Sequence, residues 1–596
     1  MRKLAVAILL SVVAVALLAV PGVAKLEKAE MTTAAVIEDA FNRGALSREE
    51  MILQKAYTLY APEKVREDLA GMKIDKCGTG MDDEIRLALP DLPEAVAEEI
   101  RGLRARPVCQ TYIETTNFRI HYDTSGTHTI LSTGYRDAIA TAVENVWDME
   151  VTTMGFRAPP PDGGDPDGGG GNSKYDVYVQ QLGTGLYGYC QGSYYYNDGP
   201  GGYPTNAATS YVVIDNDYSG FGYPDPTDPM KVTVAHEFCH GIQNAHDVNE
   251  STWYKEATST WVEDVVYDDV NDYRNYLSSF LNSLYRSISY HDGGIRWYGS
   301  CVWNFYLYEN YGYEIIVDNW YQMEGTSTTL NMMDVVLGTY GSSMEEAYGD
   351  FAVWCWFTGA RDDGTHFEEG GSWYTASVMR GHNSYPIVIG APVPGWEPDY
   401  YGCNYITMNN PGGGTPGLLV SYDGPQPGTI PNLAYINYRA SGGAYREYGG
   451  IPLNGFGVGE LTVAGWDGMQ FVGLVVANTS AGSANMSYDY NAEQVETGIG
   501  DETFAFGLRA ASPNPFAETT SIAYSVPTGG GLVDIVVYDV NGREVRRLVH
   551  EQMGAGAGKA VWDGLDNSGE NVASGVYFAK LDIDGLTASG KLIMLK

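Results

Sequence analysis

The spacing of apolar and polar positions predicts a helical part, a mixed part and two β parts along the chain. In residues 25–107, apolar residues recur at helical spacing. Ser47-Arg-Glu-Glu50 is a capping box that predicts a helix ending before Pro62. Pro93 opens a second stretch with one apolar face. These residues therefore predict a small helical module.

Residues 108–390 mix strand patterns with helical ones. The segment 175–179 alternates between apolar and polar residues, and 211–215 is rich in β-branched residues, so both are predicted strands. Apolar residues from Met230 onward then lead into a predicted helix. This mixture predicts an α+β domain.

The remaining residues carry strand patterns only. Glycines separate short apolar strands in residues 391–492, which predicts a β-sandwich domain. Residues 493–506 are an acidic linker. In residues 507–596, strands at 533–540 and 544–549 flank an Asn-Gly turn and predict a hairpin in a second β-sandwich. The chain is thus predicted to hold several domains.

The first 24 residues have the pattern of a secretion signal. Arg2 and Lys3 precede an apolar run, and Gly22-Val23-Ala24 ends it with small residues suited to cleavage. We expect residues 1–24 to be removed on export. No other stretch of the sequence predicts a transmembrane segment, so we expect a secreted or cell-surface protein.

The net charge limits the kinds of partner that the protein can have, and the cysteine content bears on disulfides. The formal net charge is −39, and loss of the signal would make it two units more negative. A surface this acidic argues against nucleic acid and anionic membranes as partners. Export permits disulfides, but the cysteine number is odd and their pairing cannot be read from the sequence. The seven cysteines are Cys77, Cys109, Cys190, Cys239, Cys301, Cys355 and Cys403.

The segment His236-Glu237-Phe238-Cys239-His240 carries the most specific chemistry in the chain. Residues four apart lie on one face of a helix, so His236 and His240 can direct both imidazoles at one zinc ion. Glu237 then lies beside the metal-bound water and can take its proton as a general base. The motif therefore predicts a hydrolytic zinc centre.

Two residues compete to be the third metal ligand. His246 has the third-ligand spacing of metzincins, but Gln243 occupies the position of their helix-breaking glycine. Glu256 begins Glu256-Ala-Thr-Ser-Thr-Trp261, which resembles the second helix of gluzincins, where a Glu followed by small residues supplies the third ligand. We favour Glu256. Glu263 or Asp264 could orient a ligand imidazole from the second helix.

With these motifs, the region from about Gln110 to Gly390 resembles a secreted bacterial gluzincin-type zinc metallopeptidase of the immune-inhibitor-A-like kind. The resemblance implies a zincin fold, Zn²⁺ held by His236, His240 and Glu256, and protein or peptide substrates. It also implies an oxyanion donor from a later segment. Tyr298 is the first candidate for that donor and His291 the second.

Two further features leave alternatives open. A helical module between a signal and a peptidase domain suggests a propeptide. Its Cys77 could cap the zinc as a thiolate or pair with Cys109 in a disulfide. The Asp/Gly-rich segment 162–172 could hold Ca²⁺ or be a surface linker.

The C-terminal module has a resemblance of its own. It closely resembles FlgD-like Ig folds and the C-terminal sorting domains of type IX secretion. This implies delivery to the outer surface or beyond, with the secretion machinery as a partner. The motifs that carry the resemblance are Ser512-Pro-Asn-Pro-Phe516, Tyr538-Asp-Val-Asn-Gly542, Trp562-Asp-Gly564 and Ser574-Gly-Val-Tyr577.

The sequence therefore predicts a secreted zinc metalloendopeptidase with Glu237 as its general base. The alternative is a surface-attached binding or structural protein whose β modules act while the peptidase domain is inactive. The presence of Glu237 favours the enzyme, because an inactive site has no need of a general base.

Overall fold

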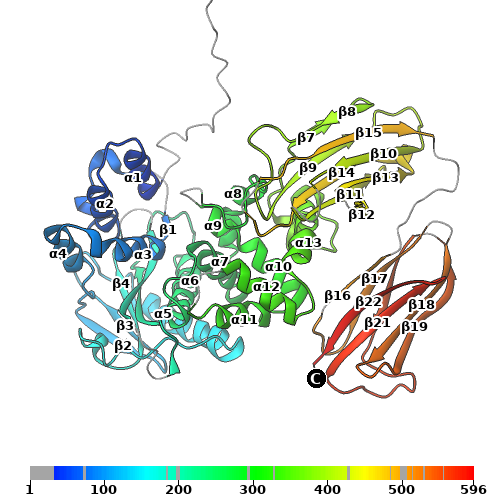
Figure 1. Cartoon of the computed structure of the whole chain (residues 1–596). Coiled ribbons are helices and arrows are strands. Elements are labelled where there is room, and N and C mark those ends of the chain that lie inside the picture. The colour runs from blue at the N-terminus through cyan, green and yellow to red at the C-terminus, as the bar shows by residue number, and fades with distance from the viewer. Residues whose placement is uncertain are drawn as a thin grey trace, which may run out of the picture.

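The computed structural model describes most of the chain (Figure 1). The predicted signal, residues 1–24, lies outside the described residues, as does most of the predicted linker 493–506. None of the helices described is both long and apolar enough to cross a membrane. The described residues are 32–71, 75–182, 186–195, 202–291, 295–325, 329–425, 430–454, 456–482, 485–496, 507–512, 514–527, 530–554 and 556–595.

The N-terminal module is helical, and it packs onto the central sheet. The predicted capping box is confirmed, because the Ser47 hydroxyl and the Glu50 carboxylate each accept a hydrogen bond from the other residue's backbone N–H. The apolar core of the module continues into Tyr178, Leu186 and Tyr211 of the sheet. The elements are α1 (Thr33–Asn42), α2 (Arg48–Tyr60), β1 (Asp75–Cys77), α3 (Thr79–Ala88) and α4 (Glu94–Leu103).

A six-stranded sheet forms the centre of the next region, in the order β1-β5-β6-β4-β3-β2. Strands β3, β4 and β6 run parallel, whereas β5 is antiparallel to β6 and β2 to β3. β1 of the N-terminal module pairs in parallel with β5 and so completes one edge. The remaining strands are β2 (Thr111–Glu114), β3 (Phe118–Tyr122), β4 (Tyr175–Gln180), β5 (Leu186–Tyr195) and β6 (Ala208–Asp215).

Helices cover this sheet and extend away from it (Figure 1). α6 lies on β5 and β6, between α5 and α7. A single apolar core joins these helices to the sheet and to the helices that follow. The helices are α5 (Thr133–Trp147), α6 (Thr227–His246), α7 (Thr252–Val266), α8 (Leu277–Leu281), α9 (Arg296–Gly299), α10 (Cys301–Tyr311), α11 (Glu314–Gln322), α12 (Thr329–Thr339) and α13 (Met344–Trp356).

A β-sandwich follows, with a four-stranded sheet (β13-β10-β15-β8) facing a five-stranded one (β12-β11-β14-β9-β7). Its first strands precede residue 391, the predicted start of this domain. Trp356 of α13 packs closely over Gly473 and so joins the sandwich to the helices. The strands are β7 (Arg380–His382), β8 (Ile387–Gly390), β9 (Gly402–Asn409), β10 (Gly417–Asp423), β11 (Asn432–Ala440), β12 (Tyr445–Gly450), β13 (Val458–Ala464), β14 (Met469–Asn478) and β15 (Asp489–Val495).

The C-terminal module is a second, smaller β-sandwich, drawn in orange and red in Figure 1. Its sheets have the orders β16-β17-β20 and β19-β18-β21-β22. The predicted hairpin is confirmed as β18 and β19, and Gly542 in its turn has φ 77°. The strands are β16 (Gly507–Ser512), β17 (Thr520–Val526), β18 (Gly531–Asp539), β19 (Glu544–Met553), β20 (Gly556–Trp562), β21 (Gly575–Ile583) and β22 (Leu586–Met594).

Candidate metal centre

Two adjacent buried helices carry the candidate site. α6 places His236, Glu237 and His240 together, and α7 brings Glu256 against them. Each of these four residues is at most 2% exposed. The small residues 257–260 after Glu256 are fully buried, and they let α7 pack close to α6. The structure thus brings together every ligand residue of the favoured prediction.

The candidate ligand atoms converge on one point. The His236 Nε2 atom lies 3.2 Å from both His240 Nε2 and Glu256 Oε2, and His240 Nε2 lies 3.6 Å from Glu256 Oε2. The Cys77 Sγ atom joins them, at 3.3 Å from His240 Nε2. Tetrahedral ligands with bonds of about 2.1 Å are about 3.4 Å apart. The separations therefore fit a zinc ion at the centre of the group.

Hydrogen bonds fix the orientation of both imidazoles. His236 Nδ1 donates to Glu263 Oε1 at 2.6 Å, and His240 Nδ1 donates to Gln243 Oε1 at 2.7 Å. With Nδ1 as the donor, the neutral tautomer keeps a lone pair on each Nε2. Both lone pairs then point into the group, as metal ligation requires.

The electrostatics of the group favour positive charge at its centre, carried either by a proton on His236 or, with both imidazoles neutral, by a metal ion. Burial lowers the pKa of His236, but Glu256 and Glu263 more than compensate and raise it to about 9. Burial raises the pKa of Glu256, yet His240 and His236 bring it down to about 2. The ligand carboxylate thus carries its charge, and the residues present fit a divalent ion with nitrogen, oxygen and sulfur ligands.

Glu237 lies beside the ligand atoms rather than among them. Its Oε2 accepts a hydrogen bond from the Thr79 hydroxyl at 2.8 Å and lies 3.5 Å from Cys77 Sγ. Burial raises the pKa of Glu237, while the two neighbouring imidazoles oppose that shift. A raised pKa suits a group that must take a proton and later release it.

The two candidate oxyanion donors occupy different positions. The ring of Tyr298 in α9 lies beside His236, with the ring centroids 6.0 Å apart, and it also contacts Tyr276. His291 is exposed and stacks on Trp297. Tyr298 therefore borders the centre, and His291 contacts neither histidine of the motif in the interactions of the described residues.

His246 lies outside the group of ligand atoms. It is fully buried at the end of α6, and its Nδ1 atom pairs with Glu324 Oε1 at 2.8 Å. Its ring also packs against Tyr321. The metal-type cluster found in the described residues comprises Cys77, His236, His240 and Glu256.

The cysteines are free thiols throughout the described chain. Of the two alternatives for Cys77, the structure has the thiol beside the candidate ligand atoms and not in a disulfide with Cys109. The Cys109 Sγ atom instead accepts a hydrogen bond from Gln180 Nε2. Cys239 is fully buried within α6.

The Asp/Gly-rich segment 162–172 surrounds an arginine. The Arg106 guanidinium lies 3.0 Å from carboxylate oxygens of Asp162 and Asp167, and 2.8 Å from Asp176. One side chain from the segment after α4 thus forms ion pairs with all three carboxylates. Ca²⁺ binding by this segment stays a prediction.

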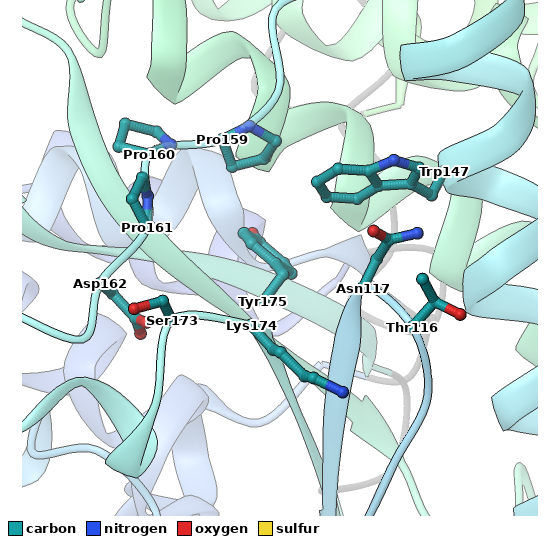
Figure 2. Close-up of a pocket in the computed structure, with 10 residues that line it drawn as sticks. All are labelled: Thr116, Asn117, Trp147, Pro159, Pro160, Pro161, Asp162, Ser173, Lys174 and Tyr175. Carbon is teal, nitrogen blue, oxygen red and sulfur yellow. The ribbon is translucent and has the colours of Figure 1, made fainter. Parts of the chain in front are cut away.

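A pocket of about 250 Å³ lies apart from the metal cluster. Figure 2 shows three consecutive prolines, 159–161, facing Trp147 across it, with Tyr175 and Asn117 between them. None of the cluster residues lines this pocket. We assign this pocket no role, because the candidate metal ligands and Glu237 lie elsewhere.

Sequence reasoning missed two residues that complete the site. Gln243 orients His240, and its amide is held by hydrogen bonds to Lys255 O and Ser259 Oγ. Its position one helical turn after His240 is the signal that could have identified it. Lys76 donates to Glu263 at 2.8 Å and also pairs with Asp272. Nothing in the local sequence marks Lys76.

Comparison with known proteins identifies one module. Residues 514–584 match the model of the FlgD Ig-like domain. The C-terminal part of the chain therefore contains an FlgD Ig-like domain. No curated protein matches the chain.

Similarities to solved structures are weak. PorZ, an essential surface component of the type-IX secretion system of Porphyromonas gingivalis, shares 18% identity over 20% of this chain and 15% of its own, with a TM-score of 0.12. The BSP domain of a biofilm-associated protein shares 9% sequence identity, over 30% of this chain and 45% of its own, with a TM-score of 0.12. A β-1,2-glucanase from Parabacteroides distasonis shares 9% over 36% of each chain, with a TM-score of 0.13. The chain spans less than half of each of these proteins, and TM-scores this low support no inference about fold or function.

Proposed function

We propose that the protein is a secreted zinc-dependent endopeptidase. The observation that supports this most is the convergence of His236 Nε2, His240 Nε2 and Glu256 Oε2, with Glu237 directly beside them. In this proposal the region from Gln110 to Gly390 is a zincin of the gluzincin kind. The buried α6–α7 pair against a mixed sheet supports that assignment.

Each residue has a defined task in peptide hydrolysis. A bound zinc ion would supply Lewis acidity toward the scissile carbonyl and lower the pKa of a water. Glu237 accepts the proton of that water at a carboxylate oxygen and passes it to the leaving amine. Tyr298 borders the site from α9 and would donate its hydroxyl to the developing oxyanion. Glu263 and Gln243 hold the imidazoles in place.

We also propose that the protein acts at the cell surface or outside the cell. The FlgD Ig-like domain at residues 514–584 supports a sorting role for the C-terminal module. The sequence pattern of residues 1–24 supports export. The secretion machinery would then be the partner of this module.

The alternative is a surface binding or structural protein with an inactive peptidase domain. Two β-sandwiches at the C-terminal side favour it, since such modules commonly bind. The buried Glu237 favours the enzyme instead. Burying a carboxylate beside metal-type ligands is costly, and a purely structural domain gains nothing from it.

One experiment separates these functions. The purified chain is analysed for zinc and assayed on casein, before and after limited proteolysis of its N-terminal module and with and without a chelator. We expect bound zinc and chelator-sensitive digestion by the processed form. Glu237→Gln should retain zinc and lose about a hundredfold or more of the activity, because an amide cannot accept the proton.

A matched control is Glu345→Gln, on an exposed residue of α13, which should leave the activity unchanged. Absence of zinc, or near-normal turnover by a zinc-loaded Glu237→Gln protein, would exclude the proposed mechanism and favour the binding protein.

A further inference from the structure

The thiol of Cys77 completes the group of ligand atoms from outside the peptidase region. Its Sγ atom lies 3.3 Å from His240 Nε2, and the side chain is only 7% exposed. Three protein ligands leave a catalytic zinc one open position, and a sulfur ligand is well suited to it. Cys77 is supplied by the N-terminal module, far from α6 in sequence.

The backbone around Cys77 is held firmly in place. β1, the edge strand of the sheet, pairs with β5, with Cys77 opposite Gly188. The Gly78 N–H donates to Gly188 O at 2.9 Å. Gly188 lies directly over α6, since a Cβ there would come within 3.1 Å of Glu237 Cγ. The pairing therefore fixes the depth at which the thiol reaches the cluster.

The residues next to Cys77 also make close contacts with the surrounding structure. Lys76 is buried between Glu263 and Asp272, and Glu263 is the residue that orients His236. A side chain at Gly78 would come within 2.5 Å of Leu59. Thr79 donates its hydroxyl to Glu237 Oε2 and accepts from the Cys190 N–H, both at 2.8 Å.

A backbone hydrogen bond also positions the sulfur. The Thr79 N–H, at the first turn of α3, donates to Cys77 Sγ at 3.3 Å. This hydrogen bond holds the sulfur in its orientation toward His240.

We propose that the N-terminal module is an inhibitory pro-region and that the Cys77 thiolate is the fourth ligand of the zinc centre, which keeps the peptidase latent. The inference rests on the proposed function. The sulfur fills the position that water needs, and Thr79 engages the general base Glu237. The thiol proton passes to solvent when the sulfur binds the ion. Activity then requires that residues 75–79 leave the edge of β5.

Cobalt substitution tests the ligand directly. Cobalt(II) takes the place of zinc, and a cobalt–thiolate bond gives a charge-transfer band in the near ultraviolet. We expect the unprocessed full chain to show this band and Cys77→Ala to lose it at equal cobalt content. Cys77→Ser is a second variant in case the alanine protein does not fold. Cys109→Ala is the matched control and should keep the band, because Cys109 bonds to Gln180 instead.

Latency is measured on the zinc forms of the same proteins. Unprocessed Cys77→Ala should digest casein about tenfold faster than the unprocessed wild-type chain, and Cys109→Ala should not. A cobalt-loaded wild-type chain without the band would overturn the inference and leave the proposed function intact. Loss of the band with no gain in activity would also overturn it. Failure to bind either metal would instead remove the proposed function, and this inference with it.

Discussion

Helices α6 and α7 bury a different kind of residue from those in the core of the C-terminal module. α6 and α7 enclose three histidines and three glutamates, each residue at most 2% exposed. The two cores of the C-terminal module consist of apolar and aromatic side chains, and its one histidine, His550, has a half-exposed side chain. Burying charge costs stability unless each group is paired. The first region therefore depends on the pairing of its buried charges, whereas the core of the second has no such requirement.

The largest effect is expected in the apolar module. Trp562 is fully buried between Phe516 and Tyr577, so Trp562→Ala should destabilise a fragment of residues 507–596 by about 3–5 kcal/mol in denaturant unfolding. Phe578→Ala, at a position 40% exposed, is the control and should cost far less. Similar losses at both positions would contradict the assigned core. Casein digestion by the full chain should be unaffected by either change.

The next effect concerns the metal ligands. Glu256→Ala should reduce zinc affinity by more than about 100-fold, since outer partners alone contribute about 10–100-fold. His246→Ala should not, because His246 pairs with Glu324 away from the cluster. Competition with a chelating dye measures both affinities. If His246→Ala lowered zinc affinity more than Glu256→Ala, the third ligand would be His246, as in metzincins.

A smaller effect is expected where a neutral residue supports the site. Gln243→Ala removes the acceptor of the His240 Nδ1–H and should weaken zinc binding about tenfold. Gln322→Ala, on an exposed residue at the end of α11, is the control. Equal affinities for the two variants would show that Ser259, which lies 3.3 Å from the same nitrogen, is sufficient.

The smallest effect on chemistry is expected from removing the C-terminal module altogether. Deleting residues 507–596 should leave casein digestion unchanged, because no group of metal ligands lies in the described part of this module. In the native host it should change where the protein is found. Fractionation and a casein assay measure the two outcomes. Loss of activity with unchanged location would assign the module to the catalytic unit.

Local patterns were enough to predict much of the site. His236, Glu237 and His240 are set by helical spacing, and Glu256 by the small residues after it, so the sequence identified the residues that α6 and α7 bring together. The hairpin around Gly542 follows from turn chemistry alone. These features depend on neighbours in sequence, which single-sequence reasoning can use.

Long-range contacts could not be predicted in the same way. Cys77 meets His240 across 163 residues, through the pairing of β1 with β5. Arg106 meets Asp176 across 70 residues. Both contacts depend on how one module packs on another. The spacing of apolar residues within a segment carries no information about that packing. The sandwich boundary was misplaced for a related reason, since β7 and β8 are short strands that only their partners in the sheets identify.

The core shared by the N-terminal helices and the central sheet has a consequence for folding. Leu186, Tyr189 and Tyr211 are buried against those helices, so the sheet reaches its final form with them present. Once the helices are cleaved away and lost, the same apolar surface has no partner during refolding. Under the proposed function, we expect the processed form to persist because it unfolds slowly, and to fail to refold after denaturation. Its lifetime outside the cell would then be set by the rate of unfolding rather than by the equilibrium between the folded and unfolded states.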